Sequence, residues 1–166
     1  MSILPEHIEI LAKKVIQAGT AKGVFIATAE SCTGGLIGGA LTDIAGSSAV
    51  VDRGFITYTN KAKMQVLGVS ADTLREVGAV AEATAREMAE GAIKKSAAHL
   101  TVAVTGIAGP GGSEHKPGGR VHLATAGRGG VILHKKMDYG DIGRDKVRLA
   151  TIETALEMLL SALEEM

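Results

Sequence analysis

The sequence has few aromatic residues and no excess of either charge. Phenylalanine, tyrosine and tryptophan together make up 2% of the chain, whereas hydrophobic residues as a whole make up 46%. The core must therefore be filled by alanine, valine, isoleucine, leucine and methionine, packed closely through many glycines. This composition favours helices laid against a sheet over a β-sandwich. A length of 166 residues suits one hydrophobic core, so we expect a single domain over residues 1–166.

Further absences argue against several classes of protein. Eighteen basic and eighteen acidic residues cancel, and no segment gathers the like charges that attract nucleic acid or a membrane surface. No apolar run approaches the length of a membrane-spanning helix, and the start of the chain has no basic flank. We therefore expect a cytoplasmic protein with no nucleic-acid partner and no membrane contact.

Metal and cofactor chemistry also lacks a signal in the sequence. Cys32 is the only cysteine and cannot form an internal disulfide, and the five histidines show no metal-binding spacing. We expect neither a metal nor a cofactor, so the chemistry must come from ordinary side chains.

Hydrophobic periodicity predicts the order of the elements. The expected helices cover residues 8–15 and on to about 19–23, 36–41, 60–66, 70–76, 81–96, and a last helix opened by Arg144 and ending near 163. The expected strands cover 24–29, 49–51 continuing into 55–58 after a bend at Gly54, 100–104, 121–125 and 131–135. Asn60 is the predicted cap of its helix. Helices and strands alternate early and a hairpin comes late, which predicts a three-layer α/β/α domain with a mixed, mostly parallel central sheet.

Three loops that follow predicted strands carry the candidate chemistry, because open α/β sheets bind ligands at such positions. The first is residues 29–35, AESCTGG. A serine at a strand-to-helix turn lies beside unpaired backbone N–H groups that can stabilise an oxyanion. Equally, Ser31 or Thr33 can simply cap the helix that follows. Cys32 is the other possible nucleophile here, although no histidine is evident to activate its thiol.

The second loop is residues 58–63, YTNKAK. A serine nucleophile needs a base, and since neither residues 29–35 nor residues 58–63 contain a histidine, a lysine paired with Tyr58 is the remaining candidate. A lysine must have its pKa lowered by burial or by nearby positive charge to be neutral. The helix start and a second cation at Lys61 act in that direction. The alternative is that these lysines are solvated surface residues.

The third loop runs from Thr105 to Lys116 and is rich in glycine. Its backbone N–H groups can converge on a phosphate or carboxylate, and Lys116 adds positive charge. The loop is neither a Walker motif nor a dinucleotide-binding fingerprint. Its length favours a functional role over a purely structural one. Arg144 can meet an anion or a carbonyl at the start of the last helix.

Taken together, these stretches in this order resemble the CinA C-terminal domain family. The similarity runs from residue 27 to about 148 and is carried by residues 29–35, 46–48 (GSS), 58–63, 68–69, 78–80, 105–110 (TGIAGP) and 116–117. Stand-alone members of that family are nicotinamide-nucleotide amidases. The resemblance implies hydrolysis of the carboxamide of nicotinamide mononucleotide, with Ser31 as nucleophile, Lys63 as base, and Tyr58 and Arg144 as assisting groups.

The resulting hypothesis is an acyl-enzyme mechanism in a small amidase. The oxyanion is held by N–H groups near residues 32–34 or in the Thr105–Gly106 turn, and the phosphate rests in the loop from Thr105 to Lys116. The substrate-binding residues we expect are Cys32, Thr33, Gly34, Ser48, Thr105, Gly106, Gly109 and Lys116. We also expect a homo-oligomer. A non-catalytic pyridine-nucleotide-binding or regulatory domain is the alternative, and a phosphotransferase is disfavoured because no carboxylate cluster is available for Mg²⁺.

Overall fold

A computed structural model describes residues 2–113 and 115–166 of the chain. Its strands are β1 (Ile26–Glu30), β2 (Val51–Ile56), β3 (Leu100–Gly106), β4 (Arg120–Gly127) and β5 (Gly130–Asp138). Its helices are α1 (Glu6–Lys22), α2 (Leu36–Thr42), α3 (Asn60–Leu67), α4 (Ala71–Val77), α5 (Glu82–Lys94) and α6 (Arg144–Glu164), and a short 3₁₀ turn η1 (Ser47–Ala49) precedes β2. Each predicted element is present at nearly its expected place.

The five strands form one sheet in the order β2-β1-β3-β4-β5. The strand β1 pairs in parallel with β2 and β3, whereas β3–β4 and β4–β5 are antiparallel. Four of the five strands therefore run in one direction, and only β4 opposes them. The predicted mixed, mostly parallel sheet is confirmed.

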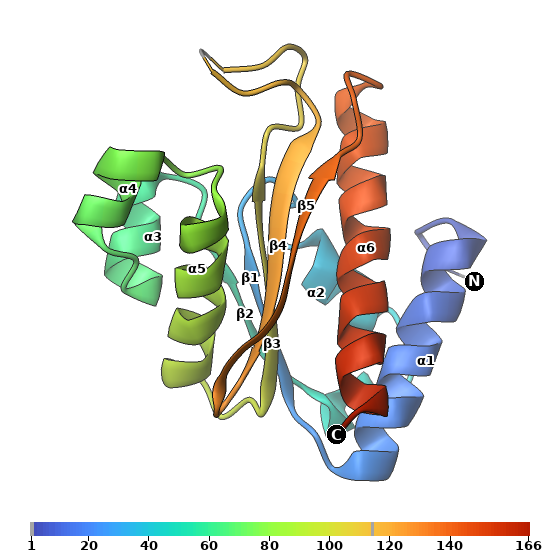
Figure 1. The fold of residues 1–166 in the computed structure, drawn as a ribbon. Helices are drawn as coiled ribbons and strands as arrows, with labels where there is room; N and C mark the ends of the chain where they lie inside the picture. Colours follow the sequence, from blue (N-terminus) through green and yellow to red (C-terminus); the bar gives the residue numbers. More distant parts are fainter. Residues whose placement is uncertain (1, 114) are drawn as a thin grey trace.

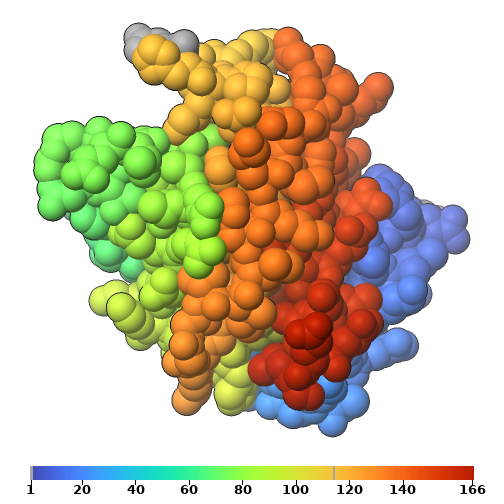
Figure 2. Space-filling model, in the orientation of Figure 1, coloured from blue at the N-terminus to red at the C-terminus, as the bar shows by residue number. Residues whose placement is uncertain are grey.

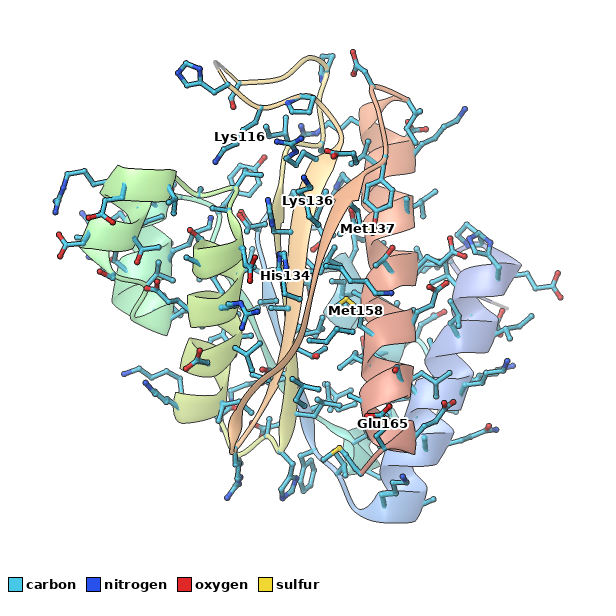
Figure 3. The ribbon with its side chains drawn as sticks, viewed as in Figure 1. Lys116, His134, Lys136, Met137, Met158 and Glu165 are labelled. Atoms are coloured by element: carbon cyan, nitrogen blue, oxygen red, sulfur yellow. The ribbon has the colours of Figure 1, made fainter. Side chains whose placement is uncertain are left out.

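Helices cover both faces of this sheet, as Figure 1 shows, with α1, α2 and α6 on one face and α3, α4 and α5 on the other. Alternate side chains of a strand point to opposite faces. In β3, Leu100, Val102 and Val104 join the large aliphatic core under α1 and α6, to which Met158 of α6 also belongs (Figure 3). Ala103 faces α5 in a smaller core made mostly of alanines. The scarcity of aromatic residues is thus met by close packing of small side chains.

The helix α3 is held in place at both of its ends. The hydroxyl of Thr59 accepts a hydrogen bond from the N–H of Ala62, so Thr59 caps the helix and the prediction of Asn60 as the cap is wrong by one residue. At the other end, the carbonyl of Leu67 lies against Gly91 of α5, where a Cβ would approach it to 1.9 Å. Only glycine permits this approach, and it fixes how far α3 stands from the sheet.

We predicted a bend of the strand β2 at Gly54, and this prediction is wrong. The strand runs unbroken to Ile56. Its irregularity lies earlier, since Ile26 pairs with Val51 and Ala27 with Arg53. At position 54 a Cβ would lie 2.8 Å from the Thr28 hydroxyl, so the glycine serves close strand pairing.

The loop between β3 and β4 stands at the end of the sheet where the parallel strands finish, above α4 and α5 in Figure 2. Among residues 2–113 and 115–166, no helix combines the length and the apolar character needed to cross a membrane.

Candidate active site

The carboxyl ends of β1, β2 and β3 surround a cavity of ≈ 340 Å³. The chain passes from β1 to β2 on one side, and β3 then lies on the other side of β1. Ligands bind at such a reversal of strand order in open α/β sheets. Most of the predicted site residues line this cavity: Ser31, Cys32, Tyr58, Lys63, Thr105, Gly106, Gly109 and Arg144.

Ser31 and Lys63 are in direct contact in the floor of the cavity. The Lys63 Nζ lies 2.9 Å from the Ser31 Oγ, 2.8 Å from the carbonyl oxygen of Thr57 and 3.2 Å from that of Tyr58. The Lys63 side chain is 1% exposed and Ser31 is 7% exposed. A neutral amine has two N–H groups and one lone pair. In the protonated form the third N–H of Lys63 donates to the Ser31 Oγ, whereas in the neutral form, with both N–H groups given to the carbonyls, the lone pair faces the serine hydroxyl.

Burial lowers the pKa of Lys63, since a charged amine loses its hydration in the floor of the cavity, and Cys32 opposes this shift only as the smaller influence. The exposed Lys61, which we expected to contribute, is not among the causes. Its charge remains in solvent. Desolvation alone therefore moves the amine toward the neutral form that a general base requires.

The turn that carries Ser31 is fixed by Glu30, the last residue of β1. Its buried carboxylate accepts hydrogen bonds from the N–H groups of Gly35, Ile37 and Gly38 and from the hydroxyls of Thr28 and Thr33. The negative charge thus satisfies the free N–H groups at the start of α2. Five donors hold the carboxylate, and with it the residues that flank Ser31, in one arrangement.

Lys63 is paired with Tyr58 through the backbone carbonyl of the tyrosine, while the phenol points to Arg144. The phenol oxygen accepts a hydrogen bond of 2.9 Å from Arg144 Nη2, and Arg144 Nη1 donates to the carbonyl of Gly109 at 2.8 Å. The side chain of Tyr58 is 59% exposed at the rim, and only its backbone carbonyl meets the buried amine. Arg144 therefore ties the tyrosine to the glycine-rich loop across the mouth of the cavity.

Lys116 lies in a second cavity of ≈ 520 Å³, which shares Ala79, Val80, Ile107 and Ser113 with the first. Its amine donates to the carbonyls of Val77 and Val80, at 2.8 and 2.5 Å, and Figure 3 shows it reaching from the loop toward the α4–α5 connection. Among the residues that the structure describes, these two carbonyls are the hydrogen-bond partners of the amine, which leaves one N–H of its ammonium group for a ligand. Thr105 holds the same connection through a 2.9 Å hydrogen bond to the carbonyl of Ala79.

Three of the expected substrate-binding residues line neither cavity. The Thr33 hydroxyl is fully buried against Glu30, and the Gly34 N–H is used by the carbonyl of Ser31. Ser48 is exposed in η1, before β2, and therefore at the opposite end of the sheet from the cavity. We predicted Thr33 and Gly34 as site residues because they follow Ser31 in the sequence, and Ser48 because it belongs to a motif shared with the family. Neither kind of evidence tells where a side chain points.

Sequence reasoning gave no role to Glu30 or Arg148. A charged residue at the end of an otherwise apolar strand is the signal that identifies Glu30 as a buried, fully paired group. Arg148 stands four residues after Arg144 and so lies on the same face of α6. Its guanidinium contacts the Ser31 turn.

Cys32 is a poor alternative nucleophile. Burial raises the pKa of its thiol to about 11, which leaves almost no thiolate at neutral pH. Within the part of the chain that the structure describes, no three His, Cys, Asp or Glu side chains gather as a metal site would require.

Known proteins resemble this chain over nearly its whole length. The family model described as the CinA C-terminal domain matches residues 8–163. The chain is 49% identical to the nicotinamide-nucleotide amidohydrolase PncC of Enterobacter agglomerans, covering 93% of both proteins, and 49% identical to PncC of Escherichia coli K12, covering 90% of both. The crystal structure of the competence/damage inducible protein CihA from Agrobacterium tumefaciens is 61% identical, with a TM-score of 0.94 over 99% of both chains.

Proposed function

The chain belongs to the CinA C-terminal domain family, and we propose that it is an amidohydrolase that converts nicotinamide mononucleotide and water to nicotinic acid mononucleotide and ammonia. The near full-length similarity to two PncC amidohydrolases supports this activity. We further propose that it works without a cofactor, in the cytoplasm and as a homo-oligomer.

The contact between Lys63 and Ser31 is the observation that carries the proposal. A serine oxygen 2.9 Å from a desolvated amine is the pairing of nucleophile and base that acyl transfer needs. It lies in the floor of a cavity large enough to hold a nicotinamide ring and its ribose.

In the first half of the reaction, the neutral amine of Lys63 takes the proton of Ser31 as its Oγ attacks the carboxamide carbon. The carbonyl oxygen becomes an oxyanion, and the backbone N–H of Cys32, at the cavity wall, is our proposed donor to it. The protonated Lys63 then gives its proton to the amide nitrogen, the C–N bond breaks and ammonia leaves. The carbonyls of Thr57 and Tyr58 hold the amine in place in both protonation states.

In the second half, water attacks the acyl-enzyme and transfers a proton to the neutral Lys63. The tetrahedral intermediate collapses, the bond from carbon to the Ser31 Oγ breaks, and the proton on Lys63 returns to the serine oxygen. Nicotinic acid mononucleotide leaves as the carboxylate. One amine therefore serves as base and acid in both halves.

The phosphate of the substrate binds at the glycine-rich loop, toward the second cavity. Backbone N–H groups of the loop and the remaining N–H and charge of Lys116 are suited to a phosphate. The ring then lies against Ser31 and the phosphate at the far end, which selects the mononucleotide over free nicotinamide.

Two matched substitutions on α3 test this mechanism. Lys63→Met removes the buried amine and should reduce ammonia release from nicotinamide mononucleotide by at least about 1,000-fold, whereas Lys61→Met removes an exposed charge and should leave it unchanged. Ser31→Ala should be as inactive as Lys63→Met. Circular dichroism establishes that each variant is folded. A folded Lys63→Met or Ser31→Ala enzyme with full activity would remove that residue from the mechanism.

The same assay separates the amidase from a non-catalytic nucleotide-binding domain. That alternative predicts saturable binding of nicotinamide mononucleotide by calorimetry with no ammonia produced by the unsubstituted chain. Running the assay with a chelator present also tests whether any activity depends on a divalent metal.

A further inference from the structure

Arg148 of α6 reaches the Ser31 turn from outside the cavity. Its Nε donates to the carbonyl of Cys32 at 3.1 Å, and its Nη2 donates to the carbonyl of Thr33 at 3.3 Å. It is not among the residues that line the cavity. A Cβ at position 34 would lie 3.4 Å from the same Nη2, so the guanidinium packs closely on the turn.

These contacts fix the direction of consecutive peptide groups. In a planar trans peptide the C=O and the following N–H point in opposite directions. The carbonyl of Ser31 accepts from the N–H of Gly34, which orients the N–H of Cys32 away from it. The carbonyl of Cys32 is held by Arg148, which orients the N–H of Thr33 away from the guanidinium.

We propose that Arg148 is a positioning residue that keeps the carbonyls of Cys32 and Thr33 turned away from the reacting carbon. By holding the Thr33 carbonyl it orients the N–H of Gly34, which holds the carbonyl of Ser31, and the N–H of Cys32 is thereby presented to the oxyanion. The inference rests on the proposed function. The Glu30 carboxylate accepts from N–H groups of residues 35–38. The Arg148 guanidinium donates to the carbonyls of residues 32 and 33, which lie between Ser31 and those N–H groups. Each charge meets the backbone dipoles of opposite sign, and together they leave the turn one orientation.

An arginine suits this task better than a lysine. The planar guanidinium offers several N–H groups in a fixed fork, so Nε and Nη2 can bind two neighbouring carbonyls at once. A lysine is a point charge on a flexible chain and holds only one position firmly. With neither an arginine nor a lysine at position 148, the Cys32–Thr33 peptide could rotate and turn a carbonyl oxygen toward the developing negative charge.

The test compares Arg148→Met and Arg148→Lys with Arg128→Met, in which an exposed arginine of the β4–β5 turn is removed. Arg148→Met should lower kcat for ammonia release roughly 10- to 100-fold, less than the loss of an oxyanion donor itself, with KM changed by less than about threefold. Arg148→Lys should fall between this variant and the unsubstituted enzyme, and Arg128→Met should match the unsubstituted enzyme. The pH at which kcat falls on the acid side should not move, because Lys63 keeps its surroundings.

A second readout does not depend on the substrate. An alkyl fluorophosphonate forms a bond from the Ser31 Oγ to phosphorus as fluoride leaves, and the phosphoryl oxygen uses the same N–H groups. The rate of this labelling, followed by intact mass, should fall in Arg148→Met by a factor similar to that for kcat. If Arg148→Met is poorly folded, Arg148→Ala takes its place in the assay. Added guanidinium should then recover part of the labelling rate that Arg148→Ala has lost.

The outcomes separate the two proposals. A labelled chain that releases no ammonia would refute the amidase, and the labelling rates would then decide the role of Arg148 alone. An active enzyme whose folded Arg148→Met variant keeps its kcat and labelling rate, or whose loss appears in KM alone, would overturn the positioning role. A chain that neither labels nor releases ammonia would overturn both.

Discussion

Replacing Gly91 by alanine tests whether the spacing of two helices controls the chemistry. Gly91 lies on α5, and its Cβ would stand 1.9 Å from the carbonyl oxygen and 2.9 Å from the carbonyl carbon of Leu67, at the end of α3. Both atoms belong to the backbone, so no side-chain rotation relieves the overlap. The helix α3 must move back by about 1.5 Å before the contact reaches normal van der Waals separation.

This movement acts on the Ser31–Lys63 pair, because Lys63 precedes Leu67 by one turn of the same helix. A displacement of about 1.5 Å takes the 2.9 Å contact between Nζ and Oγ beyond good hydrogen-bond length. Misplacement by about 1 Å already costs about 100-fold in rate. The overpacking lowers the free energy of unfolding by about 1–3 kcal/mol, which exceeds the gain of about 1 kcal/mol from replacing glycine by alanine within a helix.

The assay pairs kcat for ammonia release with urea unfolding, and Gly39→Ala is the matched control. Gly39 also lies in a helix, α2, but a Cβ there would meet nothing within 4 Å. We expect Gly39→Ala to keep its kcat and to gain up to about 1 kcal/mol in stability. If Gly91→Ala behaved like Gly39→Ala in both measurements, the close contact between α3 and α5 would not set the position of Lys63.

Three further predictions follow from charged groups. Glu30→Gln should lower the free energy of unfolding by about 2–4 kcal/mol in urea titrations, because an amide donor then faces the donors that the buried carboxylate satisfied; equal stability would contradict the role of Glu30 in the turn. Because burial lowers the pKa of Lys63, the unfolded chain binds more protons between that pKa and the ordinary lysine value, so stability should rise with pH across this window and less so in Lys63→Met. Lys116→Met should raise KM for nicotinamide mononucleotide roughly 10- to 100-fold and leave KM for nicotinamide riboside unchanged. An equal rise in KM for both substrates would limit the role of Lys116 to holding the Val77–Val80 segment.

The sequence predicts the fold well because each element carries its own local pattern. Apolar runs bounded by glycine give the strands, and the stripes at three- and four-residue spacing give the helices. The location of the site is also predictable, since parallel strands finish at one edge and the polar loops follow them. Ser31 was therefore a candidate nucleophile and a lysine of residues 58–63 its candidate base, and the resemblance to a family selected Lys63 over Lys61.

The contacts within the site depend on side-chain directions that local patterns do not contain. The phenol of Tyr58 points to Arg144 because α6, more than eighty residues later, places a guanidinium there. The role of Glu30 depends on the position of α2 relative to β1, which is a tertiary property. The lowered pKa of Lys63 likewise arises from burial by the whole fold rather than from its neighbour Lys61.

The helix α6 covers one face of the sheet and supplies both guanidinium groups beside the site, yet the ribosome makes it after every strand. A nascent chain that has reached β5 already contains Ser31 and Lys63, but it lacks Arg144 and Arg148 and leaves the aliphatic face of β3 and β4 uncovered. During synthesis this chain should be catalytically silent and a ligand for chaperones that recognise apolar surface. We therefore expect hydrolysis to require that α6 has docked on the sheet, so that ammonia release reports this docking.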